Sequence, residues 1–161
     1  MRKQITKNLK LYFTNNFPFK SSKKSIRNNT VTLGIGGNVG NVIKRFNKLF
    51  LSLQKDSRFT ILQTSPILKN PPFGYLEQDY FLNGIIILKT NLSPMEVLNQ
   101  MQRYEKRFKR KRSFKDAPRT LDIDIIFYNN IEINTKQLTI PHKHWHHRQS
   151  VLIPLKIMKL W

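Results

Sequence analysis

The chain has 161 residues, of which 39% are hydrophobic and 11% aromatic, so it can form one ordinary domain with its own core and is not disordered throughout. Lys and Arg number 29 against 9 Asp and Glu, and this net charge of +20 predicts an anionic partner: nucleic acid, anionic lipid or a phosphorylated small molecule. The lack of cysteine excludes disulfides and thiolate nucleophiles. No apolar run approaches the roughly 20 residues of a membrane span, and we expect a cytoplasmic protein without a secretory signal.

The first 29 residues are basic and polar, and no acidic residue occurs before Asp56. Two interpretations remain open for this extension. It is either a mobile or loosely packed basic segment, or it contains a short helix over residues 4–13, where Ile5, Leu9, Tyr12 and Phe13 have spacings compatible with one helix face. We therefore expect an N-terminal extension over residues 1–29 and the main domain over residues 30–161.

The main domain begins with a strand and a helix. Residues 30–35 (TVTLGI) form an apolar run that ends in glycines, and residues 39–55 have apolar side chains at helical spacing. The glycines between them lack the lysine and hydroxyl residue of a phosphate-binding P-loop. We interpret them as a sharp turn into the helix, with Asn38 as its N-cap.

Two further strands and a second helix follow. Residues 59–68 and 80–88 are apolar and β-rich, and the first run stops at Asn70-Pro71-Pro72. Ser93-Pro94-Met95-Glu96 is typical of a capped helix start, so a helix is predicted to about residue 108. Residues 119–128 form a strand, and residues 131–133 and 151–152 are predicted to be short extended pieces. The order βαββαβ indicates the α+β class: a ferredoxin-like sandwich with a mostly antiparallel sheet and two helices on one face.

The segment P-R-T-L-D-I-D-I-I contains the strongest functional signal. Alternation along a strand puts Asp122 and Asp124 on the same face, about 6–7 Å apart, where their charges repel unless a cation lies between them. A run of nine basic residues between Arg103 and Arg119 precedes this strand. The aspartates therefore either pair with these cations or hold Mg²⁺ beside a phosphate group that the cations bind.

Aromatic, amide and histidine residues are weaker candidates. Phe73, Phe81 and Asn83 lie around the proline turn, where Asn83 offers a donor and an acceptor to a heterocycle and the rings either stack on it or pack in the core. The four histidines fall in residues 142–147. They suggest a transition-metal site, but the tract contains no carboxylate or thiol, and a histidine in contact with phosphate is the better interpretation.

Seven segments in order resemble the 6-hydroxymethyl-7,8-dihydropterin pyrophosphokinase family of folate biosynthesis. The matching segments, which extend from about residue 31 to residue 155, are L-G-I-G-G-N, P-P-F-G, F-L-N, Q-R-Y-E, P-R-T-L-D-I-D-I, T-I-P-H, and Arg148 with V-L-I-P-L.

The resemblance implies transfer of pyrophosphate from ATP to the hydroxymethyl group of the pterin, with release of AMP. It implies that Asp122 and Asp124 hold two Mg²⁺ ions and that these aspartates, Arg110 and Arg119 are catalytic. The residues it implies for ATP are Gln102, Glu105, Arg110, Arg112, Lys115, Arg119, Thr139, His142 and Arg148. Those it implies for the pterin are Asn70, Pro72, Phe73, Phe81 and Asn83. We expect a monomer that binds these two small molecules and no specific nucleic acid.

The sequence departs from the family pattern at two positions. Ser150 stands where the family has a second aromatic that stacks on the pterin, and Trp145 is a candidate replacement. Asp116 replaces an aromatic that closes over the substrates. A family member with weakened activity is therefore one alternative. A basic RNA-binding module on a ferredoxin-like sheet is another, although paired aspartates would repel a phosphate backbone.

Overall fold

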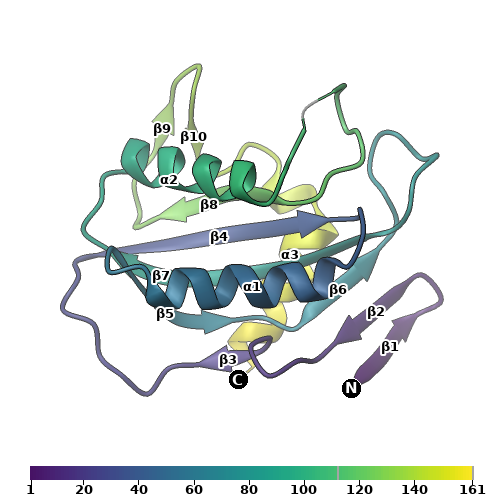
Figure 1. Cartoon of the computed structure of the whole chain (residues 1–161), viewed down its shortest axis with the longest axis horizontal. Helices are drawn as coiled ribbons and strands as arrows, with labels where there is room; N and C mark the ends of the chain where they lie inside the picture. Colours follow the sequence, from purple (N-terminus) through teal and green to yellow (C-terminus); the bar gives the residue numbers. More distant parts are fainter. Residues whose placement is uncertain (112, 161) are drawn as a thin grey trace.

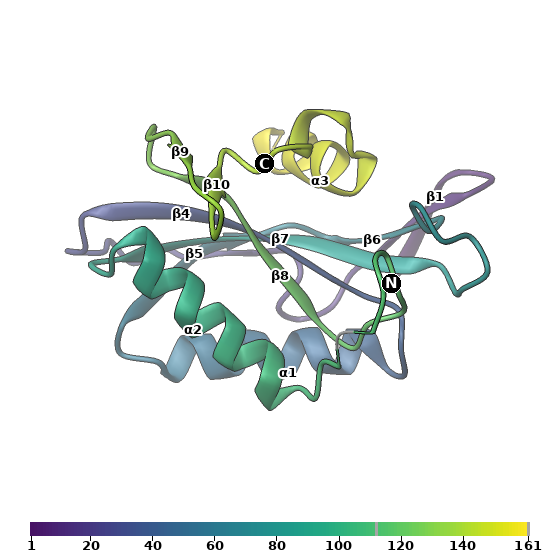
Figure 2. The ribbon, with the colours of Figure 1, turned by 90° about the horizontal axis from the view of Figure 1, so that it is seen from above.

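A computed structural model, which describes residues 1–111 and 113–160, gives the protein an antiparallel sheet with helices on both faces (Figures 1 and 2). The strands of the eight-stranded sheet are β1 (Arg2–Thr6), β2 (Leu9–Tyr12), β3 (Phe19–Lys20), β4 (Asn29–Gly37), β5 (Phe59–Thr64), β6 (Ile67–Asn70), β7 (Phe81–Thr90) and β8 (Asp122–Tyr128). Its order is β1-β2-β6-β7-β4-β8, with β5 also beside β7 and β3 beside β5. A separate hairpin consists of β9 (Ile133–Asn134) and β10 (Thr139–Ile140). The predicted α+β class is confirmed.

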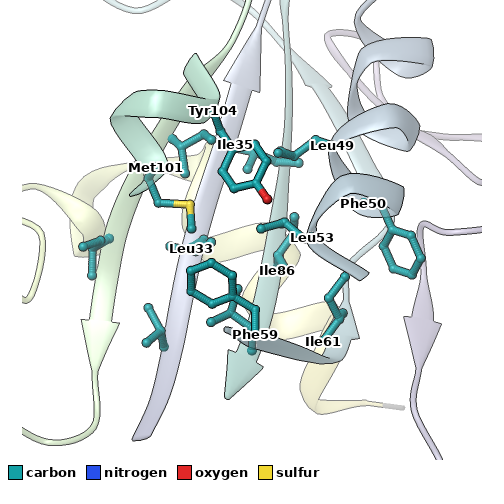
Figure 3. Packing of buried hydrophobic residues seen from close by; sticks show 14 of the residues in the cluster. Leu33, Ile35, Leu49, Phe50, Leu53, Phe59, Ile61, Ile86, Met101 and Tyr104 are labelled. Atoms are coloured by element: carbon teal, nitrogen blue, oxygen red, sulfur yellow. The ribbon is translucent and has the colours of Figure 1, made fainter. Parts of the chain in front are cut away.

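Helices α1 (Val42–Lys55) and α2 (Pro94–Arg107) lie on one face of the sheet, and α3 (Gln149–Lys159) lies on the other (Figure 2). The main core forms between the sheet and α1 and α2, where Leu33 and Ile35 of β4 meet Leu49, Leu53 and Met101 of the helices (Figure 3). Alternation along β4 turns the residues between them, Gly34 and Gly36, toward the opposite face. One face of the central strands therefore belongs to the main core, and the other packs on α3 through a second, smaller cluster.

Helix starts follow local chemistry, but one of the two predicted caps is wrong. Ser93 caps α2 in a complete capping box with Glu96, as predicted. The cap of α1 is Asn41, whose side chain accepts a hydrogen bond from the Lys44 backbone N–H, and not Asn38. The reason is that β4 continues through Gly37, so the chain turns three residues later than the glycine pattern indicates.

The predicted helix over residues 4–13 is wrong, because this segment forms β1 and β2. Strand β2 pairs with β6, and its alternating residues Leu9 and Leu11 pack on Leu68. The segment is not loosely packed either. Phe17 is fully buried in the main core beside the rings of Phe46 and Phe50. Pairing with an available sheet edge outweighs the weak helical pattern.

The extended piece predicted at residues 151–152 is also wrong, because these residues belong to α3. The β-branched Val151 favours a strand, but Val151 and Met158 are buried at helical spacing against Ile85 and Ile126 of the sheet. No helix in the described residues is long and apolar enough to cross a membrane.

The burial of Phe17 predicts that the N-terminal segment contributes to global stability. Phe17→Ala is expected to lower the free energy of unfolding by about 3–5 kcal/mol, because it leaves a cavity between β3 and α1. Urea denaturation followed by circular dichroism measures this loss. Ile26→Ala, at a side chain that is 96% exposed, is the control and should change stability by less than about 0.5 kcal/mol. Equal stabilities for the two variants would contradict the packing described here.

Candidate active site

Asp122 and Asp124 project from β8 toward the face of the sheet that carries α3. Their neighbours Ile123 and Ile125 are buried in the main core, so strand alternation directs the two carboxylates away from it. The prediction that the aspartates share one face is confirmed by this register. β8 lies at the edge of the sheet next to β4, and the carboxylates are therefore accessible to groups from the loops beyond that edge.

Two glycines of β4 lie beside the carboxylates, and Gly36 leaves room next to Asp122 while the Ile126 side chain covers Gly34. Gly36 pairs with Asp122 and Gly34 with Asp124, and paired residues in antiparallel strands point to the same side of the sheet. A Cβ atom at Gly36 would lie 2.7 Å from the Asn83 side-chain oxygen, so a larger residue would displace that amide. Gly34 and Gly36 alternate with Leu33 and Ile35. The predicted strand over residues 30–35 already contains Gly34, and this period of two was the available signal that the strand continues through Gly36.

Asp122 is held by two arginines from the basic run. Arg110 Nη1 lies 2.6 Å from Asp122 Oδ1, and Arg119 Nη1 lies 3.1 Å from Asp122 Oδ2. Arg110 also pairs with Glu105 of α2, which is buried. The ion pairs that the sequence offered as one alternative are therefore present, and they place two guanidinium groups beside the acidic strand.

Asp124 lacks such a partner. Among the described residues, none donates a hydrogen bond to its carboxylate, and the nearest basic group is His142, with Nε2 3.8 Å from Asp124 Oδ2. Burial, reinforced by Arg148, lowers the pKa of His142, so the imidazole is neutral at pH 7. Burial and then the charge of Asp122 raise the pKa of Asp124. A cation at this carboxylate would remove the cost of its charge.

A cavity of about 420 Å³ lies beside Asp122, between the sheet and the start of α3. Its lining includes all five residues predicted for the pterin: Asn70, Pro72, Phe73, Phe81 and Asn83. Arg119 and Arg148 also line it. The structure therefore brings the residues predicted for the pterin next to Arg119 and Asp122, which follow them by about forty positions in the sequence.

Two asparagines form the polar part of this cavity. Asn83 of β7 lies opposite Gly36, and its Nδ2 donates a hydrogen bond of 2.6 Å to Asn70 Oδ1 at the end of β6. Asn70 in turn donates to the carbonyl of Pro71. This chain of bonds fixes the orientation of the Asn83 amide and leaves its oxygen facing Gly36.

Two aromatic rings in the cavity each carry an arginine. The guanidinium of Arg119 lies 5.4 Å from the Phe81 ring centre, and that of Arg148 lies 5.6 Å from the Phe73 ring centre. Arg148, predicted on the ATP side, thus lies among the residues predicted for the pterin. Trp145 does not line the cavity and packs on Phe127, so it does not replace the aromatic missing at Ser150.

The other residues predicted for ATP lie in smaller hollows near the acidic strand. Gln102, Glu105 and Arg110 line one of about 270 Å³, and Asp124, Thr139 and His142 line another of the same size. Lys115 lines a third with Arg110 and Arg119. Arg112 lies outside the described residues. Asp122 and Asp124 thus connect the large cavity with the hollows where the nucleotide was predicted.

Asn38 is a site residue that the sequence interpretation missed. It is buried, and its Nδ2 donates to Gln78 Oε1 at 2.8 Å and to the carbonyl of Asp79 at 3.0 Å. Its Oδ1 accepts a 3.0 Å hydrogen bond from the backbone N–H of Arg119. Gln78 then donates to the carbonyl of Asp116. One amide thus ties the loops before β7 and before β8 to the end of β4.

The described residues contain no group of three or more His, Cys, Asp or Glu side chains that could hold a metal ion. The four histidines of residues 142–147 form no such group. Mg²⁺ makes a different demand, because it commonly takes one or two carboxylates and completes its shell with water and phosphate oxygens. The pair of aspartates, with Asp124 unbonded, fits that donor set.

Comparisons with known proteins agree with this geometry. The model of the 7,8-dihydro-6-hydroxymethylpterin-pyrophosphokinase family matches residues 32–159. A 2-amino-4-hydroxy-6-hydroxymethyldihydropteridine pyrophosphokinase of Helicobacter pylori is 43% identical, over 89% of this chain and 90% of its own length. Enzymes of the same name from Campylobacter jejuni and Bacillus subtilis are 41% and 34% identical, over 86% and 80% of this chain and 88% and 77% of their own lengths.

The isolated position of Asp124 predicts an unusual pH dependence of stability in metal-free protein. Folding raises the pKa of the Asp124 carboxyl above its ordinary value of about 3.9. Between the unfolded-state and folded-state pKa values, the folded protein binds more protons than the unfolded chain, so the free energy of unfolding falls as pH rises through this range. Asp124→Asn should raise the free energy of unfolding by roughly 1 kcal/mol at pH 8 and leave it unchanged at pH 3. The gain is modest because 37% of the side-chain surface is exposed and water screens the charge.

Urea unfolding in the presence of a chelator, at both pH values, measures the effect. Equal stability of the variant and the wild-type protein at pH 8 would show that the ionised Asp124 carries no such cost.

Proposed function

The chain belongs to the 7,8-dihydro-6-hydroxymethylpterin-pyrophosphokinase family, and we propose that the cavity beside Asp122 is where it performs the family's reaction. It transfers pyrophosphate from ATP to the hydroxymethyl group of 6-hydroxymethyl-7,8-dihydropterin, a step of folate synthesis, and ATP is the co-substrate. One observation carries the site proposal: the Asn70–Asn83 amide pair and two aromatic rings line the same cavity as Asp122, an aspartate that two arginines hold.

We propose that the pterin binds in the part of the cavity formed by Asn70, Pro72, Phe73, Phe81 and Asn83. The amide of Asn83 is oriented by Asn70 and offers complementary hydrogen bonds to the edge of the heterocycle. Phe81 and Phe73 offer apolar faces to a flat ring. Phe73 is 72% exposed, so its ring is available without displacing packed side chains, and Arg148 already lies against it.

The triphosphate of ATP is assigned to the hollows along β8. Arg110, Lys115 and Arg119 supply positive charge there, and Arg112 is proposed for the same role from the sequence alone. Gln102, Glu105, Thr139 and His142 are proposed to contact the nucleoside end. In the absence of ligand, Arg110 and Arg119 are paired with Asp122. Metal binding at the aspartates would free the guanidinium groups for phosphate oxygens.

Two Mg²⁺ ions are proposed at Asp122 and Asp124. When bound, they would neutralise charge on the triphosphate. The unbonded Asp124 carboxylate supports this proposal, because a cation there offsets the cost of a partly buried negative charge beside Asp122. Glu105 lies behind Arg110 and holds that arginine toward the acidic strand.

The reaction is proposed to be a direct in-line displacement. The pterin hydroxyl oxygen forms a bond to the β-phosphorus, the bond from that phosphorus to the oxygen bridging to the α-phosphate breaks, and AMP leaves with that oxygen. The hydroxyl proton is released to solvent. The chain contributes by fixing the pterin through Asn83 and the phosphates through Arg110 and Arg119, so that catalysis rests on position and charge.

We also propose a ferredoxin-like arrangement for the central part of the fold. Strands β4, β6, β7 and β8 with α1 and α2 follow the order βαββαβ, and the sheet order β6-β7-β4-β8 supports this description. On that view, β1, β2, β3 and α3 are additions around a four-stranded centre.

The first prediction from this assignment concerns the two aspartates. Asp122→Ala and Asp124→Ala are each expected to lower kcat by about 10³-fold or more, because each removes charge stabilisation worth several kcal/mol in the transition state. AMP formation from ATP and 6-hydroxymethyl-7,8-dihydropterin, with Mg²⁺ present, measures the loss. Glu132→Ala, an exposed carboxylate outside the cavity, is the control and should retain wild-type turnover. Near-normal turnover of either aspartate variant would refute the metal assignment.

The second prediction separates the pterin side from the ATP side. Asn83→Ala should raise the KM for the pterin about tenfold or more, because a donor and an acceptor on the bound pterin lose their partner in the Asn83 amide. The KM for ATP should stay the same. Steady-state kinetics with each substrate varied in turn gives both values. Asn99→Ala, at an exposed position of α2, is the matched control. An unchanged KM for the pterin would contradict the role of Asn83.

A further inference from the structure

The basic run that precedes the acidic strand is divided by the fold. Arg110, Lys115 and Arg119 lie at the proposed active site, whereas Arg107 and Lys109 line a separate cleft of about 440 Å³. We call it the helix-end cleft. It is formed by the first turns of α1, the end of α2 and Thr120, and its charged lining residues are Lys44, Arg45, Lys48, Arg107 and Lys109. Its volume is within the range of small-molecule sites.

The cations of the helix-end cleft are uncompensated within the described residues. No carboxylate lines the cleft, and none of the ion pairs found there or elsewhere in the described chain includes its five basic residues. The active site differs, because Glu105 and Asp122 neutralise its arginines. Lys44 and Lys48 are also one helical turn apart, where like charges repel.

Helix α1 increases this electrostatic cost. Lys44 lies in its first turn, at the positive end of the helix dipole, and that turn contains no acidic residue to offset the charge. Arg45 is held by the carbonyls of Val39 and Thr120 at 2.8 Å and 2.7 Å, which are neutral partners, and burial lowers its pKa. An anion in the cleft would relieve all of these unfavourable terms together.

Thr120 closes one side of the helix-end cleft, and its carbonyl accepts a hydrogen bond from Arg45. Its Oγ1 is shielded from water and has no hydrogen-bond partner among the described residues. The hydroxyl is therefore not open to a ligand, and an anion in the cleft would be held by the cations, which are the groups that bind phosphate oxygens.

We propose that the helix-end cleft binds a small phosphate-bearing anion, for which inorganic pyrophosphate is the probe. Lys44, Lys48 and Lys109 neutralise its charge. Lys109 and Thr120 are the residues next to Arg110 and Arg119, at the two ends of the loop that carries the active-site arginines. The bound anion ties the Lys109 end of this loop to α1, and Arg45 already holds the other end through the Thr120 carbonyl. Anion binding is therefore coupled to nucleotide binding, and each ligand changes the affinity of the other by the same factor.

The experiment is a titration of the full-length, ¹⁵N-labelled protein with pyrophosphate, without Mg²⁺ and at constant ionic strength set with chloride. Amide resonances of residues 41–48 and 107–109 should shift and saturate in the wild-type protein. In the Lys44→Gln/Lys48→Gln variant, the dissociation constant from these shifts should rise at least tenfold, while shifts of residues 122–124 at the active site persist.

A double variant with the same change of charge is the control. Lys55→Gln/Lys136→Gln alters two exposed lysines away from the cleft, and it should bind pyrophosphate as the wild-type protein does. AMP formation without added pyrophosphate should equal the wild-type rate in both double variants.

Four results would overturn the proposal. They are the absence of saturable shifts at residues 41–48, an equal loss of binding in the two double variants, and a loss of basal activity confined to Lys44→Gln/Lys48→Gln. The fourth is tighter binding of a ten-nucleotide RNA than of pyrophosphate at the same amides, which would assign the cleft to nucleic acid.

Discussion

The mutual repulsion of two carboxylates on one strand face is the constraint on which the site depends. Asp122 and Asp124 cannot both remain charged at low cost unless positive groups surround them. The fold meets this demand for Asp122 with Arg110 and Arg119, and leaves Asp124 beside a neutral histidine. The two carboxylates are thus compensated only at Asp122, and this asymmetry supports the proposal of a divalent cation at Asp124.

The sheet solves a problem of space as well as of charge. A site needs room directly above a strand, yet the strands must pack tightly on their other face to hold it rigid. The alternation along β4 achieves both, because Leu33 and Ile35 enter the core and Gly36 leaves a hollow beside Asp122 and Asn83. Rigidity comes from one face of β4 and access from the other.

Much of this architecture could be predicted from the sequence, and the failures have physical reasons. The strand carrying Asp122 and Asp124 and the capped start of α2 follow from local alternation and capping chemistry, and both are confirmed. The N-terminal strands could not be found in the same way, since their stability comes from pairing with β6, which is distant in sequence. Asn38 was misassigned for a related reason: its partners lie on two loops forty and eighty residues away.

Strand β1 ends the sheet, and this position has a consequence for solubility. An edge strand presents unpaired backbone groups to which another chain can add. All five residues of β1 are exposed, and Arg2 and Lys3 begin it. Two molecules that approached through this edge would bring the charges of Arg2 and Lys3 close to one another. This repulsion opposes self-association of the sheet into fibres.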